Sequence, residues 1–135
     1  MNAMEGAMVG YLEGRNGFPK DKKKGFHWAQ KAHEAGSVFG LAELGQLLAV
    51  GSGVARNQAE GAMYLGIAAE KGSNFACYCL GSYILDGSHG FGADKAKAAL
   101  WLEKSLDTDC KHRNMGEALI ADAKQKLDGI KNGNH

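Results

Sequence analysis

The stretch LGQLLAVGSGV, residues 44–54, decides the fold, because its leucines follow a helical pattern while its glycines interrupt that pattern. Glycine is a poor helix former, so its presence there needs a structural reason. A related stretch, LGSYILDGSHGF at 80–91, follows about 36 residues later, with glycines at matching positions. The glycines are therefore periodic, and the period indicates a repeated structural unit.

Three segments align on this period, at 7–36, 44–72 and 80–109. Each carries two helical patterns joined by a glycine-rich turn, and a period of about 30 to 40 residues of this kind is the signature of a helical solenoid. We predict an all-α superhelix with three helix-turn-helix repeats at about 3–36, 40–72 and 76–109, in a single domain over 1–135. The predicted helices cover about 2–13, 21–35, 38–49, 57–71, 74–86, 94–107 and 115–129. The last of them is predicted to cap the third repeat, because it has one apolar stripe among charged residues.

The glycines of the second repeat are of two kinds. Gly51 and Gly53 follow the first helix, where glycine reaches left-handed backbone angles without a Cβ clash, and Asn57 is suited to cap the next helix. Gly45 lies inside the first helix, as Gly81 does in the third repeat. We expect these interior glycines to open a notch for an aromatic side chain of the second helix.

That aromatic residue is expected to be Tyr64 in the second repeat and Trp101 in the third. With these residues the chain resembles the Sel-one-like repeat family, a relative of the tetratricopeptide repeats. The resemblance rests on two sets of residues: Leu44-Gly45, Leu48, Gly51, Gly53-Val54, Tyr64, Ala68-Ala69 and Gly72, then Ala76, Leu80-Gly81, Ile84, Gly87, Asp94, Trp101 and Lys104. The first repeat matches mainly in its second half, at Trp28, Lys31-Ala32 and Gly36.

The resemblance implies a right-handed solenoid whose first helices line a concave groove, and a non-enzymatic adaptor of bacterial origin that binds a protein or peptide there. First-helix positions outside the family's conserved frame are then the candidate partner-binding residues. They are Glu5, Val9, Leu12, Phe39, Ala42, Gln46, Ala49, Val50, Phe75, Tyr78, Ser82, Leu85 and Asp86. The alternative for Phe39 and Phe75 in particular is that they belong to the core between repeats. A specific form of the function is an immunity protein that neutralises a secreted toxin.

Bulk composition names no partner. The formal net charge is +1 with 23% charged residues, so we expect no nucleic-acid binding. No apolar run approaches the length of a membrane span, and the sequence as given predicts a cytoplasmic protein, or a periplasmic one if a leader was removed upstream. The weakly matching first helix makes homo-oligomerisation through that helix an alternative.

A cluster of cysteine and histidine in the third repeat is the alternative to a binding module. Cys77, Cys79, Cys110 and His112 are residue types that ligate zinc or serve in hydrolysis, and a cysteine- or metal-dependent hydrolase-like protein is therefore the less favoured alternative. Residues two apart on a helix point in nearly opposite directions, so Cys77 and Cys79 should not converge. We therefore predict no catalytic residue, no metal and no cofactor.

Overall fold

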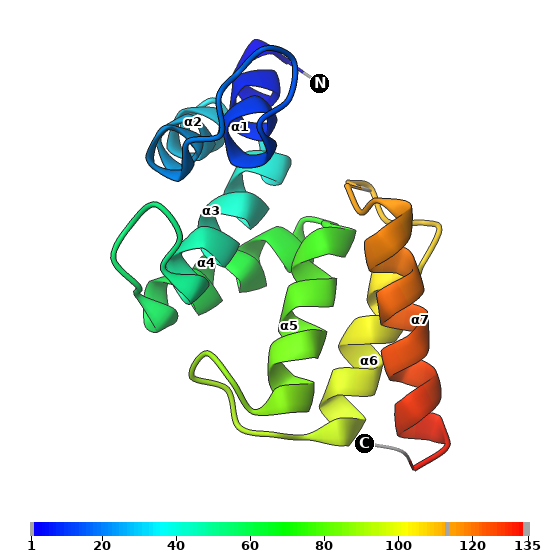
Figure 1. Cartoon of the computed structure of the whole chain (residues 1–135). Coiled ribbons are helices and arrows are strands. Elements are labelled where there is room, and N and C mark those ends of the chain that lie inside the picture. The colour runs from blue at the N-terminus through cyan, green and yellow to red at the C-terminus, as the bar shows by residue number, and fades with distance from the viewer. Residues whose placement is uncertain (1, 113, 134–135) are drawn as a thin grey trace. The chain divides into compact units, whose positions relative to one another are not determined.

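The computed structural model describes residues 2–112 and 114–133, and over these residues the chain is all-α (Figure 1). Its helices follow one another with short connections and no strand among the residues described. They are α1 (Ala3–Glu13), α2 (Lys22–Glu34), α3 (Val38–Val50), α4 (Gln58–Glu70), α5 (Asn74–Asp86), α6 (Lys95–Ser105) and α7 (Glu117–Lys131). The predicted helices are confirmed, with α7 shifted by two residues toward the C-terminus.

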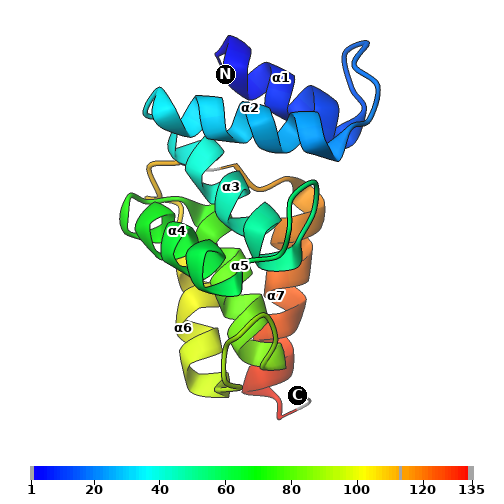
Figure 2. The same cartoon turned by 90° about the vertical axis from the view of Figure 1, so that its left-hand side faces the viewer.

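The chain divides into two compact units, the first ending at Tyr64 and the second beginning at Leu65. In the first unit α1 and α2 pack side by side and α3 packs on α2 (Figure 2). In the second unit α5 packs on α6, and α7 packs on both. No helix within 2–112 and 114–133 is long and apolar enough to cross a membrane.

Local capping explains where the helices begin. The carboxylate oxygen Oδ1 of Asp21 accepts a hydrogen bond from the backbone N–H of Lys24 at 3.1 Å, and Asp94 makes the equivalent bond with Lys97 at 3.0 Å. Asn57 Oδ1 accepts from the backbone N–H of Glu60 at 3.0 Å. These bonds satisfy amide groups that have no partner within their own helix. A capping residue is therefore in place at the second helix of every repeat, and the prediction that Asn57 caps its helix is confirmed.

The turn after α3 needs both of its glycines. Gly51 ends the helix in the left-handed conformation at φ 76°, and its N–H donates to the carbonyl of Leu47. Gly53 also has a positive φ, 75°, and a Cβ there would lie 2.2 Å from the carbonyl oxygen of Lys22. The turn therefore requires glycine for backbone conformation and for its contact with the start of α2.

The interior glycine of the third repeat allows close helix approach, but its predicted aromatic partner is wrong. A Cβ at Gly81 would meet Leu102, at 2.8 Å from its Cγ, rather than Trp101. In the second repeat the carbonyl of Gly45 is approached by Gly61, whose Cβ would lie 2.8 Å from that oxygen. Trp101 instead lies under the ammonium group of Lys104, 4.8 Å from the ring centre.

Each unit has its own buried apolar cluster. In the first unit Met8, Ala29, Leu44, Leu47 and Leu48 form the core, and Phe39 and Val9 are among the partly buried side chains around it. In the second unit Leu102 packs with Ala123 and Leu127 of α7. The burial of α7 side chains on α6 gives this helix the covering role that the sequence predicted for it.

Candidate binding surface

The first helices of the repeats supply the surface predicted to bind a partner. Four of the predicted residues are buried and present no side chain to a partner: Ala42 is 0% exposed, Ala49 1%, Ser82 6% and Phe75 9%. For these four the predicted role is corrected. Ala49 is buried because Gly61 of α4 lies against its backbone, with a Cβ at Gly61 only 2.7 Å from the Ala49 nitrogen. Ala42 lies two turns earlier on the same side of α3.

Three residues of α1 serve packing within the first unit. Glu5 caps its own helix together with Asn2, and its Oε2 accepts a hydrogen bond from the hydroxyl of Ser37 at 2.6 Å. Leu12 lies against α2, where a Cβ at Gly25 would come 2.4 Å from its Cδ2. Val9 packs against the core cluster of the first unit. Glu5 joins the starts of α1 and α3, and Leu12 joins α1 to α2.

A stripe of partly exposed side chains runs along α3. We call this the α3 face and define it by Phe39, Glu43, Gln46 and Val50. Their spacing of four, three and four residues puts them on one side of the helix. Three of them were predicted, although Phe39 also packs against the core. Glu43 was missed because the predicted set was chosen around the family's frame, and the helical spacing from Phe39 to Gln46 would have found it.

Glu43 is the unusual residue of the α3 face. Protein surrounds most of its carboxyl group, and this burial, together with the negative charge of Glu13, raises the pKa of Glu43 to about 7. Among residues 2–112 and 114–133, no hydrogen bond or ion pair satisfies its carboxylate. Glu13 is paired with Arg15, at 2.9 Å between Oε2 and Nε. A carboxyl group in such a place is neutral or ionised at neutral pH according to what lies beside it.

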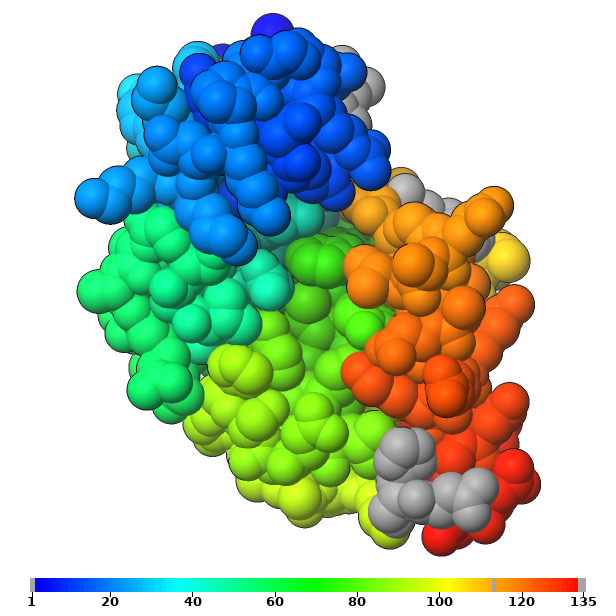
Figure 3. All heavy atoms as spheres, in the orientation of Figure 1, coloured from blue at the N-terminus to red at the C-terminus, as the bar shows by residue number. Residues whose placement is uncertain are grey.

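The equivalent surface of α5 is largely covered by α7. The hydroxyl of Tyr78 donates to Oδ2 of Asp122 at 2.5 Å, and the Lys126 ammonium donates to the Ser82 hydroxyl at 3.1 Å. Lys126 also pairs with Asp122 at 2.8 Å and lies over the Tyr78 ring. Figure 3 shows α7 bordering α5 in the second unit. Tyr78 is therefore engaged within the chain, whereas Leu85 is partly exposed and Asp86 is exposed.

This network shifts the pKa values of its members. Hydrogen bonds from Lys126 and from Tyr78 lower the pKa of Asp122 and keep it ionised. Burial, followed by the bond to Asp122, raises the pKa of Tyr78 and keeps its hydroxyl protonated. Both shifts favour the state in which the network is complete.

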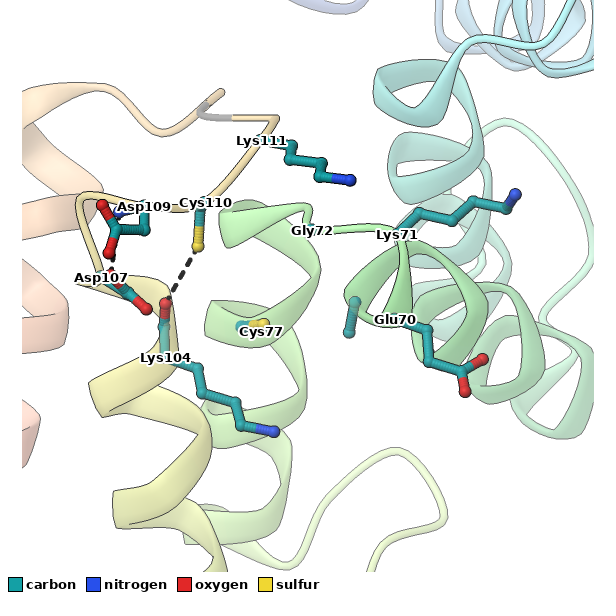
Figure 4. A pocket seen from close by; sticks show the side chains of 10 residues that line it. Glu70, Lys71, Gly72, Cys77, Lys104, Asp107, Asp109, Cys110 and Lys111 are labelled. Carbon is teal, nitrogen blue, oxygen red and sulfur yellow. Dashed lines mark hydrogen bonds between the residues drawn. The ribbon is translucent and has the colours of Figure 1, made fainter.

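A separate cavity of about 390 Å³ lies in the second unit, between the end of α4, α5 and the end of α6. Figure 4 shows Cys77 and Cys110 at this cavity, with Lys104 and Lys111 beside them. The Cys110 thiol donates to the carbonyl of Lys104 at 3.2 Å. Cys79 does not line the cavity, so the two cysteines of α5 do not meet there.

Burial, and after it the neighbouring Cys110, raise the pKa of Cys77 to about 11, while Lys104 acts in the opposite direction. A thiol of this kind stays protonated at neutral pH and is a poor nucleophile. Across 2–112 and 114–133, no group of three or more histidine, cysteine and acidic side chains is placed to hold a metal ion. The cavity therefore carries neither an activated thiol at Cys77 nor a ligand cluster in the part of the chain that the structure describes.

Repeated helix pairs, glycine-capped turns and a closing helix define the chain as a helical-repeat protein. The Sel1 repeat matches it three times, at residues 7–37, 38–73 and 74–107. The chain therefore belongs to the Sel1 repeat family, with three repeats followed by the C-terminal helix α7.

Solved structures show the same fold. A Sel1 repeat protein from Oxalobacter formigenes superposes with a TM-score of 0.66 at 28% identity, covering 76% of this chain and 41% of that one. A protective antigen of uropathogenic Escherichia coli strains, which displays an SLR fold, superposes with a TM-score of 0.66 at 22% identity, covering 93% of this chain and 30% of that one.

A relative is also found by sequence. Cytochrome c oxidase assembly factor 7A of Xenopus laevis is 43% identical over 47 residues, which is 35% of this chain and 20% of that protein. The chain thus spans less than half the length of each.

Proposed function

We propose that this chain is a non-enzymatic protein-binding module that holds a protein or peptide on the first helices of its repeats. Sel1 repeats typically mediate protein binding, which supports the class of function. The observation that carries the proposal is the α3 face, where an unpaired carboxylate and the apolar side chains Phe39 and Val50 are partly exposed together. Apolar anchors beside a polar group of this kind suit a peptide or a helix laid along the surface.

The proposed surface is narrower than the one expected from the sequence. In the first unit it consists of the α3 face with Glu13 at the end of α1. In the second unit Leu85 and Asp86 remain accessible on α5, while α7 occupies Tyr78 and Ser82. A partner that needed Tyr78 would have to replace the contacts with Asp122 and Lys126.

The test is affinity capture from a lysate of the native cells with the wild-type chain and with Val50→Asp. Val50 is the last residue of α3 and is partly exposed, so its substitution should leave the fold intact, which circular dichroism and thermal melting would check. We expect Val50→Asp to lose a specific partner that Gln30→Asp, on the exposed side of α2, retains. Equal capture by both variants would place the binding surface elsewhere.

A second function is an immunity protein that neutralises a toxin, which would use the same surface and differ only in the identity of the partner. A hydrolase centred on Cys77 and Cys110 is less well supported, because the Cys77 thiol is held protonated. If the wild-type chain has a measurable hydrolytic activity that Cys77→Ser and Cys110→Ser lose, the hydrolase becomes the better supported function.

A further inference from the structure

The α3 face carries one feature that general peptide binding does not explain. Glu43 is surrounded by protein on most sides, yet its carboxylate has no hydrogen bond or ion pair anywhere in residues 2–112 and 114–133. An ionised carboxylate in that partly exposed position has less water around it than one on an open surface, and it has no counter-charge beside it, which is unfavourable. A cation that reaches Glu43 would supply the missing counter-charge.

The charges around Glu43 sharpen this point. Glu13 is the charged residue whose field acts on Glu43, and both are negative. Arg15 lies with Glu13 on the exposed side, where both side chains are about half accessible or more, at 67% and 48%. The positive charge therefore stays at the surface beside Glu13, and the two carboxylates together favour an incoming cation.

The other members of the α3 face fit the flanks of a basic side chain. Phe39 precedes Glu43 by one helical turn, and Val50 follows it by two. Lysine and arginine have long apolar stems that pack on such side chains while the charged end reaches a carboxylate. Gln46, between Glu43 and Val50, offers an amide to a neighbouring backbone or side-chain group.

We propose that the α3 face binds a partner segment through one lysine or arginine, which pairs with Glu43 and Glu13 while neighbouring apolar side chains of the partner rest on Phe39 and Val50. This inference rests on the proposed function and names the chemistry of the partner. The equivalent position on α5 is Cys79, which is 4% exposed, so the second unit offers no similar carboxylate there.

The experiment is selection of phage-displayed random peptides of about twelve residues on the immobilised wild-type chain. We expect the selected peptides to be enriched in one lysine or arginine with apolar residues nearby. Their affinity, measured by calorimetry with synthetic peptides, should fall about tenfold on Glu43→Gln and on replacement of the basic residue by alanine. Glu34→Gln, which removes the same charge from an exposed residue of α2, is the matched control and should have little effect.

The outcomes separate the two proposals. Peptides that lose affinity on Val50→Asp but show no basic residue, or that bind Glu43→Gln as well as wild type, overturn the lysine or arginine pairing and leave the binding module standing. Selection of no peptide, or of peptides insensitive to Val50→Asp, overturns both. If light scattering shows a dimer that Glu43→Gln dissociates, the cation comes from a second copy of the chain and a separate partner is wrong. Melting curves of each variant confirm that the fold persists.

Discussion

At the scale of single residues, the pKa values of Glu43 and Cys77 differ most from the ordinary values of their residue types. Glu43 has a pKa of about 7 rather than 4.5, because burial and Glu13 disfavour its charged form. Cys77 has a pKa of about 11, which removes its nucleophilic character. In both cases the packing of the helix, rather than the residue type, sets the chemistry.

The Glu43 carboxyl should make the stability of the protein fall as the pH rises. Its folded-state pKa is above the unfolded value, so its stabilising contribution is fully present below about pH 4.5 and is lost as the pH rises through about 7. Glu43→Gln removes this dependence. We expect the variant to gain up to about 3 kcal/mol of unfolding free energy over the wild type between pH 4.5 and 8, measured by urea unfolding.

Glu34→Gln serves as the control for the loss of one negative charge. A difference between Glu43→Gln and wild type that stays constant from pH 4.5 to 8 would show that Glu43 titrates normally, and the account of its burial would then be wrong.

Among the three thiols, Cys110 should react first with an alkylating reagent. Cys110 is partly exposed, whereas Cys77 and Cys79 are 3% and 4% exposed. At about pH 8 a thiol with a pKa near 11 is ionised in roughly one molecule per thousand, so Cys77 should react slowly with iodoacetamide. Peptide mass mapping over time should show Cys110 alkylated first. Early modification of Cys77 would mean that the cavity thiol is activated and would revive the hydrolase alternative.

At the scale of helices and turns, most of the structure could be predicted because it depends on interactions between residues close together in the sequence. The glycine-capped turn at Gly51 and Gly53 and the capping residues Asp21, Asn57 and Asp94 each act within a few residues of their position. The prediction that was wrong is the side chain that meets the interior glycine Gly81, which is Leu102 rather than Trp101. That contact depends on the rotation of one helix against another, which the sequence period does not determine.

Two glycines of α4, Gly61 and Gly66, test whether close approach to α3 requires glycine, because only Gly61 contacts that helix. A Cβ at Gly61 would meet backbone atoms of Ala49 and Gly45 at 2.7 and 2.8 Å, so Gly61→Ala forces α3 and α4 apart. A Cβ at Gly66 meets nothing within 4 Å. We expect Gly61→Ala to lower the free energy of unfolding by about 2 kcal/mol and Gly66→Ala to raise it by about 1 kcal/mol, because alanine is the better helix former.

Chemical denaturation of both variants measures these changes. If the two substitutions have the same sign, backbone contact at Gly61 is not what brings α3 and α4 together.

At the scale of the whole chain, the candidate site was predictable only in part. The repeat period located the first helices. Four of the residues predicted on them are partly or fully exposed in the structure: Gln46, Val50, Leu85 and Asp86. Glu5, Leu12, Tyr78 and Ser82 are engaged by other helices of the same unit through contacts far apart in sequence. Such long-range contacts leave no local pattern, and this is why α7 could be predicted as a cap but not as a helix that occupies Tyr78 and Ser82.

The central claim is that a partner binds at the α3 face through a basic side chain. The most direct measurement is a map of backbone amide shifts in the ¹⁵N NMR spectrum as a selected peptide is added to the labelled chain. The account predicts that the largest shifts lie along residues 39–50 and at Glu13, and that Glu43→Gln needs about ten times as much peptide to produce them. Shifts that centre on α2 or α6, or on the cavity beside Cys77 and Cys110, would contradict it.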